Sequence, residues 1–314
     1  MVFDSHSDIW SDVTVRSGNG ETDIFRKYHY QRLQQGGIEG SIFAMWIDPP
    51  YDKEPDARLL QIMEAVEKEI PCCRDILRVV HDYEEMQQAK NEGIFYVFIG
   101  CEGLSGIGED LEQIDRLYEF GVRHVSLTWN EQNSLASGIR GNEEMGLTKI
   151  GIQALRRIQE RHMLFDVSHL NDKSFWDVMK HANGPVVATH SGSRSLCSVP
   201  RNLTDEMIKA LVETGGMIGV NSYPDFISQN KNEQTVSTLA RHIEHMADTA
   251  GIDRVGFGFD FCEFLKGGAP SLQGLKDASE VPNLLKAMQM IGFTQDDIEK
   301  VSYKNWHNVI KKII

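Results

Sequence analysis

Short apolar runs alternate with amphipathic segments along most of the chain. Each run is rich in Val, Ile and Phe and nearly continuous in apolarity, as expected of a parallel strand covered on both faces. Eight runs predict strands: Val2–His6, Gly40–Ile47, Phe95–Cys101, His124–Thr128, Leu164–Ser168, Pro185–His190, Met217–Asn221 and Arg254–Asp260. Amphipathic patterns between them predict helices: Leu111–Phe120, Leu147–Arg161, Asn171–His181, Thr204–Glu213 and Glu233–Ala250.

The order of these elements predicts an α/β protein with a closed barrel. Alternation of eight strands with helices, without a Pro/Gly/Ser linker or a low-complexity segment, favours a single (β/α)8 (TIM) barrel domain over residues 1–314. The competing doubly wound sheet would bind a dinucleotide through G-x-G-x-x-G at the start of a helix. Gly256-Phe257-Gly258 lacks the third glycine and comes late in the chain, so this alternative is weak.

Four connections that follow predicted strands are long. Long ordered loops are uncommon unless they carry function, and in a barrel all loops that follow strands lie on the face that holds the active site. We therefore expect four segments to shape a site: Asp48–Ala57, Trp129–Gly146, Ser222–Asn232 and Phe261–Glu280.

Charge and composition argue against two classes of binding partner, nucleic acids and membranes. The formal charge of −14 in 314 residues argues against nucleic acid, whose phosphates require a basic surface. No apolar stretch approaches the ~18 residues needed to cross a bilayer. The predicted strand at Val2 leaves no room for a cleaved signal, and five cysteines without a CxxC pair suggest reduced thiols. We expect a cytoplasmic protein without a membrane or nucleic-acid partner.

The first candidate for chemistry lies at the end of the first predicted strand. His6 and Asp8 are two residues apart, so on a strand their side chains point to the same side and could bind one ion. His-x-Asp is common by chance, and a hydrogen-bonded pair is the simpler interpretation of this motif alone.

Four further polar residues also stand where apolar runs end. Glu102 follows Phe95–Cys101, a position where burial of a carboxylate is costly unless it is paired or binds a cation. His169, His190 and Asp260 close three later runs. A single His at such a place is more often an ordinary core residue, and Glu102 could simply cap a loop.

The joint pattern is more informative than any member. In a barrel the carboxyl ends of the strands converge at one mouth, so three imidazoles and three carboxylates would meet there. Zinc favours N and O ligands, and six groups exceed the needs of one catalytic zinc. The sequence therefore predicts two cations and hydrolysis by activated water. The six residues are His6, Asp8, Glu102, His169, His190 and Asp260.

These residues and their surroundings resemble the membrane (renal-type) dipeptidases and their soluble bacterial relatives. The resemblance covers nearly the whole chain, with several motifs in the same order. The motifs are Asp4-Ser5-His6-Ser7-Asp8, Glu102-Gly103, Phe120-Gly121-Val122-Arg123, Leu127-Thr128-Trp129-Asn130, Asp166-Val167-Ser168-His169, Thr189-His190-Ser191, Pro200-Arg201-Asn202, Gly256-Phe257-Gly258-Phe259-Asp260-Phe261, and Asn305 near the end.

The resemblance implies two Zn²⁺ per chain and a role for each ligand. His6, Asp8 and Glu102 would hold one zinc. Glu102, His169 and His190 would hold the other. Glu102 would thus bridge the ions. The family implies hydrolysis of the peptide bond of dipeptides, including those with a C-terminal D-residue, through a metal-bridging hydroxide, and it implies a homodimer.

The resemblance also implies roles around the metals. Asp260 would accept the proton of the attacking water and later protonate the leaving amine, and Arg201 would bind the substrate's carboxylate. Trp129 and Asn130 would contact substrate. Mammalian members carry a His at the position of Trp129, whose indole N–H is still a donor.

The sequence departs from the family after Asp260 and leaves two rival functions open. Cys262-Glu263 stands where the family often has Asp-Gly, so the pocket there is expected to differ. One rival is a related metal-dependent amidohydrolase that acts on another amide, ester or lactone. The other is a non-catalytic binding protein on the same barrel, against which retention of all six metal-side groups argues.

Overall fold

The computed structural model describes residues 1–265 and 268–314. Its strands are β1 (Val2–Ser7), β2 (Ile38–Trp46), β3 (Leu77–Val79), β4 (Phe95–Glu102), β5 (Val122–Ser126), β6 (Leu164–Asp166), β7 (Ala188–Ser191), β8 (Ile218–Val220) and β9 (Val255–Phe257). Every pairing between them is parallel, in the order β6-β5-β4-β2-β1-β9-β8-β7.

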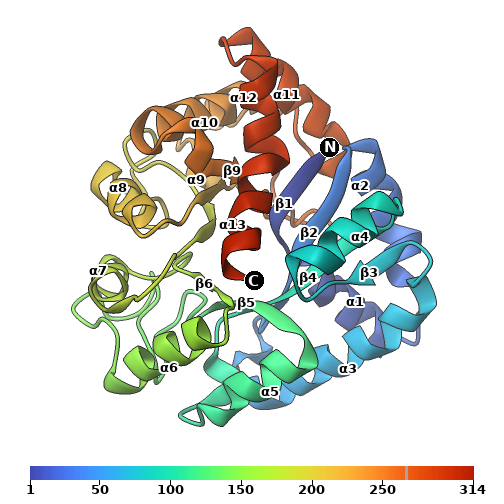
Figure 1. The fold of residues 1–314 in the computed structure, drawn as a ribbon, viewed down its shortest axis with the longest axis vertical. Helices are drawn as coiled ribbons and strands as arrows, with labels where there is room; N and C mark the ends of the chain where they lie inside the picture. The colour runs from blue at the N-terminus through green and yellow to red at the C-terminus, as the bar shows by residue number, and fades with distance from the viewer. Residues whose placement is uncertain (266–267) are drawn as a thin grey trace.

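The sheet closes on itself between its first and last strands. Val167 N donates to Val187 O over 2.8 Å, and Val187 N donates to Phe165 O over 2.9 Å, so β6 is joined to the residues that lead into β7. Eight parallel strands thus form a ring, with helices around it (Figure 1). The predicted (β/α)8 barrel is confirmed, and each of the eight predicted strands overlaps an observed one.

One of the nine observed strands, β3, was not predicted from the sequence. It pairs with Phe95–Val97 at the start of β4, while β5 pairs with the later residues of the same strand. Because β2 occupies the other edge of β4, β3 and β5 lie one after the other along one edge. Three residues that include a charged Arg78 give too short and too polar a run to indicate a buried strand.

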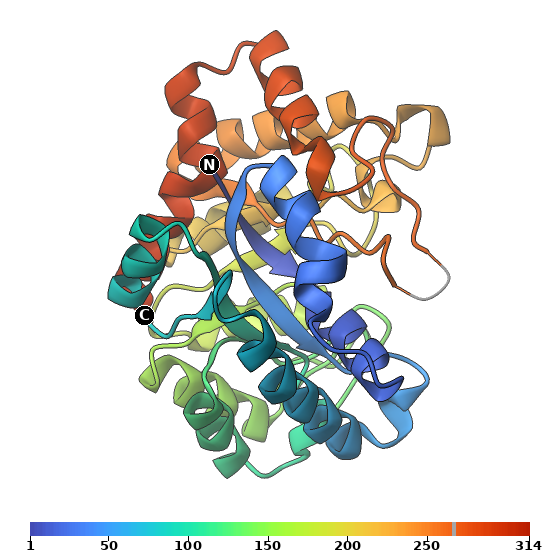
Figure 2. The same cartoon turned by 90° about the vertical axis from the view of Figure 1, so that its right-hand side faces the viewer.

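Helices cover the outside of the ring, as the view turned by 90° shows (Figure 2). The helices of the described residues are α1 (Ile9–Gly18), α2 (Gln31–Gln35), α3 (Pro55–Cys73), α4 (Tyr83–Asn91), α5 (Glu112–Phe120), α6 (Lys149–Glu160), α7 (Asp172–His181), α8 (Asp205–Glu213), α9 (Pro224–Ile227), α10 (Val236–Ala250), α11 (Val281–Met290), α12 (Gln295–Glu299) and α13 (Asn305–Ile313), of which α13 lies across one end of the ring. The five predicted helices are confirmed as α5, α6, α7, α8 and α10. Asn171 and Thr204 act as N-caps, as their side chains accept from Ser174 N and Met207 N.

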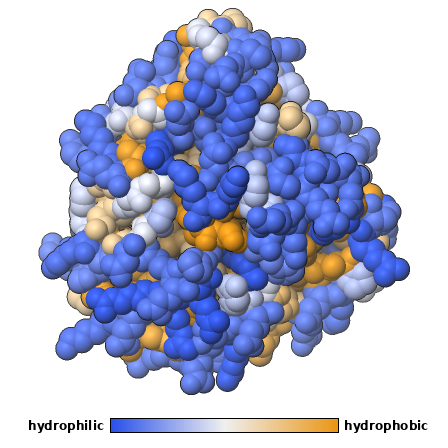
Figure 3. Space-filling view, in the orientation of Figure 1, coloured by the Kyte–Doolittle hydropathy of each residue, from blue (hydrophilic) through white to orange (hydrophobic). Residues whose placement is uncertain are grey.

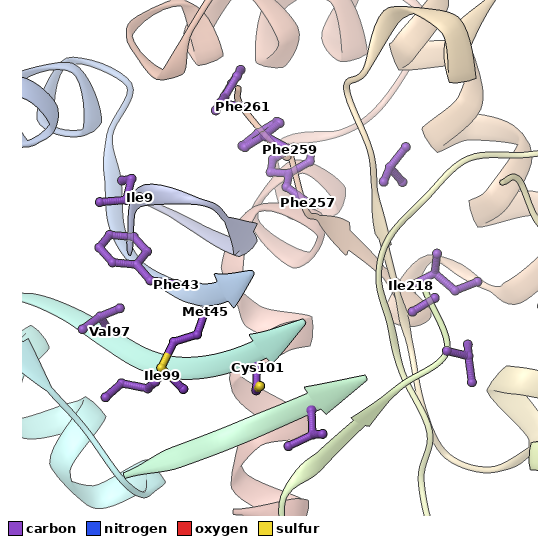
Figure 4. Packing of buried hydrophobic residues seen from close by; sticks show 14 of the residues in the cluster. Ile9, Phe43, Met45, Val97, Ile99, Cys101, Ile218, Phe257, Phe259 and Phe261 are labelled. Carbon is purple, nitrogen blue, oxygen red and sulfur yellow. The ribbon is translucent and has the colours of Figure 1, made fainter. Parts of the chain in front are cut away.

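The main core lies between the strands and the surrounding helices. Phe43 of β2 and Val97 of β4 are fully buried in it (Figure 4). Phe257, Phe259 and Phe261 stack in series along the segment that begins with β9, with ring centroids 5.0 Å apart at each step. The three rings belong to the main core, so they anchor the segment that carries Asp260.

A second core fills the end of the barrel at which the strands begin. Phe3, Tyr96 and Leu164 stand early in their strands and pack with Trp306 of α13, which lies across this opening (Figure 1). The surface seen from this side is mostly hydrophilic, with a small hydrophobic area over the end of α13 (Figure 3). A Cβ added at Gly256 would lie 2.4 Å from the Trp306 indole nitrogen, so the glycine permits this close contact.

The four long connections lie at the opposite end of the barrel, after the strands. Within the segments predicted to be loops, α3 begins at Pro55 and α9 occupies Pro224–Ile227, so these two connections are shorter than expected. Of the loop Phe261–Glu280, residues 266–267 lie outside the described residues. Throughout the described chain, none of the helices combines the length and apolarity needed to cross a membrane.

Candidate metal centre

The six polar residues expected at the barrel mouth come together there. His6, Glu102 and His190 belong to β1, β4 and β7, whose parallel direction brings their carboxyl ends to one face. His169 and Asp260 each stand three residues beyond their strand, where the backbone is left-handed, with φ of 70° and 58°. Such backbone is uncommon for residues other than glycine and clusters at functional sites, and in this chain Asp23 and His162 adopt it as well.

One carboxylate oxygen lies at the middle of the cluster. Glu102 Oε1 is 3.0 Å from His169 Nε2, 3.2 Å from His190 Nε2 and 3.5 Å from His6 Nε2. The His6 and His190 rings stack with centroids 3.7 Å apart. Three imidazole nitrogens thus point at a single buried oxygen, an arrangement suited to cations between them.

The other two carboxylates extend the cluster on the side of His6. Asp8 Oδ1 is 3.7 Å from His6 Nε2. Ligand atoms of His6, Asp8 and Asp260 lie within 4.8 Å of one another, as do those of His6, Glu102 and His190. These two groups share His6, whereas the sequence-based assignment shares Glu102 between the metals.

The orientation of His169 is fixed from behind. Its Nδ1 lies 2.8 Å from Asn130 Oδ1, and an amide oxygen can only accept, so the proton is on Nδ1. The lone pair of Nε2 therefore faces Glu102. A ligand imidazole held in this way by a hydrogen-bond acceptor is a common feature of metal sites. Asn130 thus contacts the imidazole of His169, and its predicted contact with substrate stays a prediction.

His190 is fixed by a chain of hydrogen bonds from a buried carboxylate. Thr189 Oγ1 donates to Asp166 Oδ2 and so accepts from His190 Nδ1 at 2.8 Å. Asp166 also accepts from His124 Nε2 at 2.9 Å and from the backbone N–H of Ser168 at 2.8 Å. His190 Nε2 is thereby left unprotonated, and it lies 2.9 Å from the equally unprotonated Nε2 of His169. Two lone pairs at this distance repel each other unless a cation lies beside them.

Several buried atoms of the cluster have no partner within the described chain. Both ring nitrogens of His6 and Oδ1 of Asp8 are inaccessible to solvent and make no hydrogen bond. An unpaired buried polar atom costs about 1–3 kcal/mol. Orphaned N and O atoms around a shared carboxylate match the donor set of a zinc site, so the residues present fit the metal that the sequence predicts.

Burial governs the protonation of this cluster. It raises the pKa of Glu102 well above the usual range, with a lesser contribution from Asp8 in the same direction. Burial also lowers the pKa of His169 and His190, which are neutral at physiological pH and hence able to bind a cation. For His6 burial acts in that direction too, but Glu102 and Asp8 outweigh it and raise the pKa to about 10.

Asp260 lies at the edge of the cluster with one oxygen held. Asn221 Nδ2 donates to its Oδ2 over 3.0 Å, and the Cys262 thiol lies 3.5 Å from Oδ1. Burial raises its pKa, and bound cations would act in the opposite direction. Gly258, two residues earlier, must be glycine because an added Cβ would lie 1.7 Å from Thr189 O.

Arg201 and Trp129 each lie beside one of the histidines. Arg201 is buried and donates to Ser191 Oγ over 3.1 Å and to His190 O over 2.8 Å, while its Nε has no partner within the described residues. The half-exposed Trp129 packs against His169, with ring centroids 6.1 Å apart.

Sequence reasoning missed the groups that support the cluster. Thr189, Asn221 and His124 were given no role, although each has a polar side chain in or just after a predicted strand. Asp166 stood in a recognised motif without a function. These supporting residues could have been sought in the sequence as polar residues within the apolar runs that end at the ligands.

Comparisons with known proteins agree with this geometry. The family model described as "Membrane dipeptidase (Peptidase family M19)" matches residues 1–314. A protein of Klebsiella pneumoniae encoded in the 5′ region of pqqA is 30% identical over 76% of this chain and 89% of its own length. A Schizosaccharomyces pombe protein named as an uncharacterised dipeptidase is 31% identical, over 71% of this chain and 54% of that protein.

Two solved structures have the same fold. One is the dipeptidase AC, a metallopeptidase of family M19, with a TM-score of 0.90 at 24% identity, covering 99% of this chain and 98% of that one. The other is a Rhodobacter sphaeroides metallopeptidase liganded with a phosphinate mimic of L-Ala-D-Ala, with a TM-score of 0.89 at 24% identity, covering 100% and 99%. Because the family model spans every residue, this chain belongs to the membrane dipeptidase family, peptidase family M19, and is a metallo-dipeptidase.

Proposed function

We propose that this metallo-dipeptidase uses two zinc ions and hydrolyses dipeptides, including those with a D-residue at the C-terminus. The observation that carries the zinc centre is the convergence of three imidazole Nε2 atoms on Glu102 Oε1. The ligand of the Rhodobacter sphaeroides structure, a mimic of L-Ala-D-Ala, supports the substrate class. We also propose the homodimer that the resemblance implies.

The proposed ligands are those assigned from the sequence. His6 and Asp8 would bind one zinc, His169 and His190 would bind the other, and Glu102 would bind both. Zinc in such a site polarises a carbonyl and supplies activated water near neutral pH. Because Asn130 and Thr189 hold the Nδ1 protons of the two imidazoles, the ligand lone pairs are already oriented.

Arg201 is proposed to bind the terminal carboxylate of the dipeptide. Two of its five N–H donors are used by Ser191 and His190, which fix the guanidinium and leave three donors, including the unpartnered Nε. Its burial makes a charge-assisted hydrogen bond stronger than at the surface.

Asp260 is proposed to move the proton. Asn221 holds Oδ2, so Oδ1 is the atom that would accept a proton from water as the C–O bond forms. The same proton would pass to the nitrogen as the C–N bond breaks, giving two amino acids from one dipeptide and one water. The two rotamer-restraining neighbours, Asn221 and Cys262, keep the carboxylate at the edge of the ligand group.

Metal analysis and a dipeptide panel test this proposal. We expect two zinc per chain, hydrolysis of L-L and L-D dipeptides, and no hydrolysis of the same dipeptides with an amidated C-terminus. Asp260→Asn should keep zinc and lose at least about a hundredfold in kcat, the usual contribution of an acid–base group. The exposed Asp248→Asn is the matched control.

Other outcomes contradict the proposal in separate ways. Equal turnover of amidated dipeptides, or of esters and lactones instead, would identify another amidohydrolase. Protein without stoichiometric metal would favour a binding protein on the same barrel. Full turnover by Asp260→Asn would remove this residue from the chemistry while leaving the metals in place.

A further inference from the structure

The loop after β5 folds back onto the segment that carries His169. Ile139 N donates to His169 O over 3.0 Å, and Arg140 N donates to Asn130 O over 2.8 Å. Gly138 forms an antiparallel bridge with Leu170. These main-chain bonds give Arg140 a fixed base beside the metal centre.

The side chain of Arg140 extends over an aromatic surface at the mouth. Its guanidinium carbon is 5.8 Å from the centre of the Trp129 ring. That ring packs against His169 on one side and lies 5.2 Å from the Trp46 ring. An indole face attracts a guanidinium and limits its rotamers, so the charge is held near the ligands.

The charge of Arg140 is not used within the described part of the protein. No carboxylate of residues 1–265 or 268–314 lies within 4.0 Å of its nitrogens. Three other arginines pair closely with acids, each at 2.7 Å: Arg58–Asp48, Arg194–Asp172 and Arg32–Glu263. In a protein with a net charge of −14, an exposed arginine without an acid beside the metal centre is available for an external anion.

Two guanidinium groups lie beside the histidines of the cluster. Arg140 directly follows Ile139, whose N–H donates to His169 O over 3.0 Å. Arg201 donates to His190 O over 2.8 Å. Arg201 is buried and Arg140 is exposed.

We propose that Arg140, held on Trp129, selects dipeptides whose C-terminal residue carries an acidic side chain. This inference rests on the proposed function, in which Arg201 binds the terminal carboxylate. A C-terminal residue bound there would lie beside His169, and its side chain would extend towards the exposed guanidinium. Aspartyl and glutamyl carboxylates match the planar fork of Arg donors.

The exposure of Arg140 limits how strongly it can favour an acidic substrate. Ion pairs of exposed groups contribute about 0.2–1 kcal/mol and are screened by salt, so a preference of roughly fivefold is the expected upper range. Charge reversal at this position should invert the preference, because an acidic side chain would then repel an acidic substrate.

The test compares isosteric substrates with the zinc-loaded enzyme. We expect kcat/KM for L-Ala-L-Glu to exceed that for L-Ala-L-Gln about fivefold at low salt, and less at 0.5 M NaCl. The ratio should fall to about one in Arg140→Gln and to about one-fifth in Arg140→Glu. Arg116→Gln, an exposed arginine of α5 without an ion pair in the described chain, is the matched control and should keep the ratio.

The outcomes separate this inference from the proposed function. If neither dipeptide is hydrolysed with zinc present, the proposed function fails. If both are hydrolysed equally and the ratio is the same in all variants, the inference about Arg140 is wrong and the dipeptidase proposal stands. A preference for L-Glu-L-Ala over L-Gln-L-Ala that depends on Arg140 would overturn its assignment to the C-terminal residue.

Discussion

The two ends of the barrel solve opposite problems with the same eight strands. At the end where the strands begin, Phe3 and Trp306 fill the opening, and the buried Tyr96 hydroxyl lies 2.9 Å from His307 Nε2. At the end where the strands finish, His6 and Asp8 are equally buried. Both ring nitrogens of His6 and Oδ1 of Asp8 nevertheless have no hydrogen-bond partner in the described chain.

This difference separates stability from function along one barrel axis. Apolar burial stabilises the first end by about 25 cal/mol for each Å² removed from water. Burial of carboxylates and imidazoles at the other end costs free energy that a cation would return on binding. The strands therefore carry a stabilising core at one end and a cluster at the other whose groups become satisfied when metal is bound.

The largest effect is expected from the central carboxylate. Glu102→Gln removes the charge on which three imidazoles converge, so we expect loss of at least one zinc and at least about a thousandfold fall in kcat/KM. The metal-free variant should be no less stable than the metal-free parent, because burial of this carboxylate is costly when no cation is bound. Zinc analysis, kinetics and urea unfolding measure all three.

The exposed Glu109→Gln serves as its control and should change none of these quantities. A Glu102→Gln protein that unfolds readily without metal would contradict the separation of the two ends, since the carboxylate would then be part of the stabilising framework.

The opposite result is expected at the closed end. Trp306→Ala should lower the free energy of unfolding by about 3–5 kcal/mol, because a large buried side chain leaves a cavity between α13 and Phe3. The zinc content should be unchanged. Urea unfolding measures the loss, and Trp176→Ala on α7, where 43% of the side chain is exposed, should cost little. A variant of normal stability that lost zinc would contradict the assignment of stability to this end of the barrel.

The contrast between the ends also explains what could be predicted from the sequence. Buried parallel strands form continuous apolar runs, so the barrel was recognisable, and a polar residue such as Glu102 stands out directly after such a run. The closed end was harder to predict than the metal cluster. The sequence of α13, which contains Trp306, is an ordinary amphipathic pattern and does not indicate that this helix lies across the end of the barrel.

Some features depend on contacts that no local pattern contains. The left-handed backbone of His169 and Asp260 places these side chains beyond the ends of their strands, which alternation alone does not predict. The pairing of β3 with β4 depends on which edge of β4 remains free. Asn130 was expected to contact substrate, and its hydrogen bond to His169 became evident only in three dimensions.

Asn130 allows a finer test of the polar end. Asn130→Ala removes the acceptor that holds the Nδ1 proton of His169, and loss of such a support typically weakens metal binding 10–100-fold, so we expect roughly that change in zinc Kd. Asn130→Asp keeps an acceptor and should restore most of the affinity. Competition with a chelator measures Kd. Unchanged zinc affinity with a raised KM would instead support the substrate-binding role predicted from the sequence.

The smallest effect concerns a polar group of the open end that does have partners. His242 of α10 accepts from Ser193 N over 3.2 Å and donates to Ile227 O over 3.0 Å, which fixes it as neutral and joins two loops of the mouth. Burial lowers its pKa to about 4, from 6.5. The unfolded chain then binds the extra proton, so this stability is complete above pH 6.5 and is lost as the pH falls towards 4.

From the size of this shift, His242 should account for a loss of about 1 kcal/mol of unfolding free energy between pH 7.5 and pH 5.5. His242→Gln should therefore show a shallower decline of the urea midpoint over that range than the parent protein, whereas the half-buried His181→Gln on α7 should decline in parallel with it. Parallel declines for all three would mean that His242 does not couple protonation to folding. A shallower decline would show that the neutral, hydrogen-bonded His242 stabilises the fold without metal, in contrast to His6, whose ring nitrogens have no hydrogen-bond partner in the described chain.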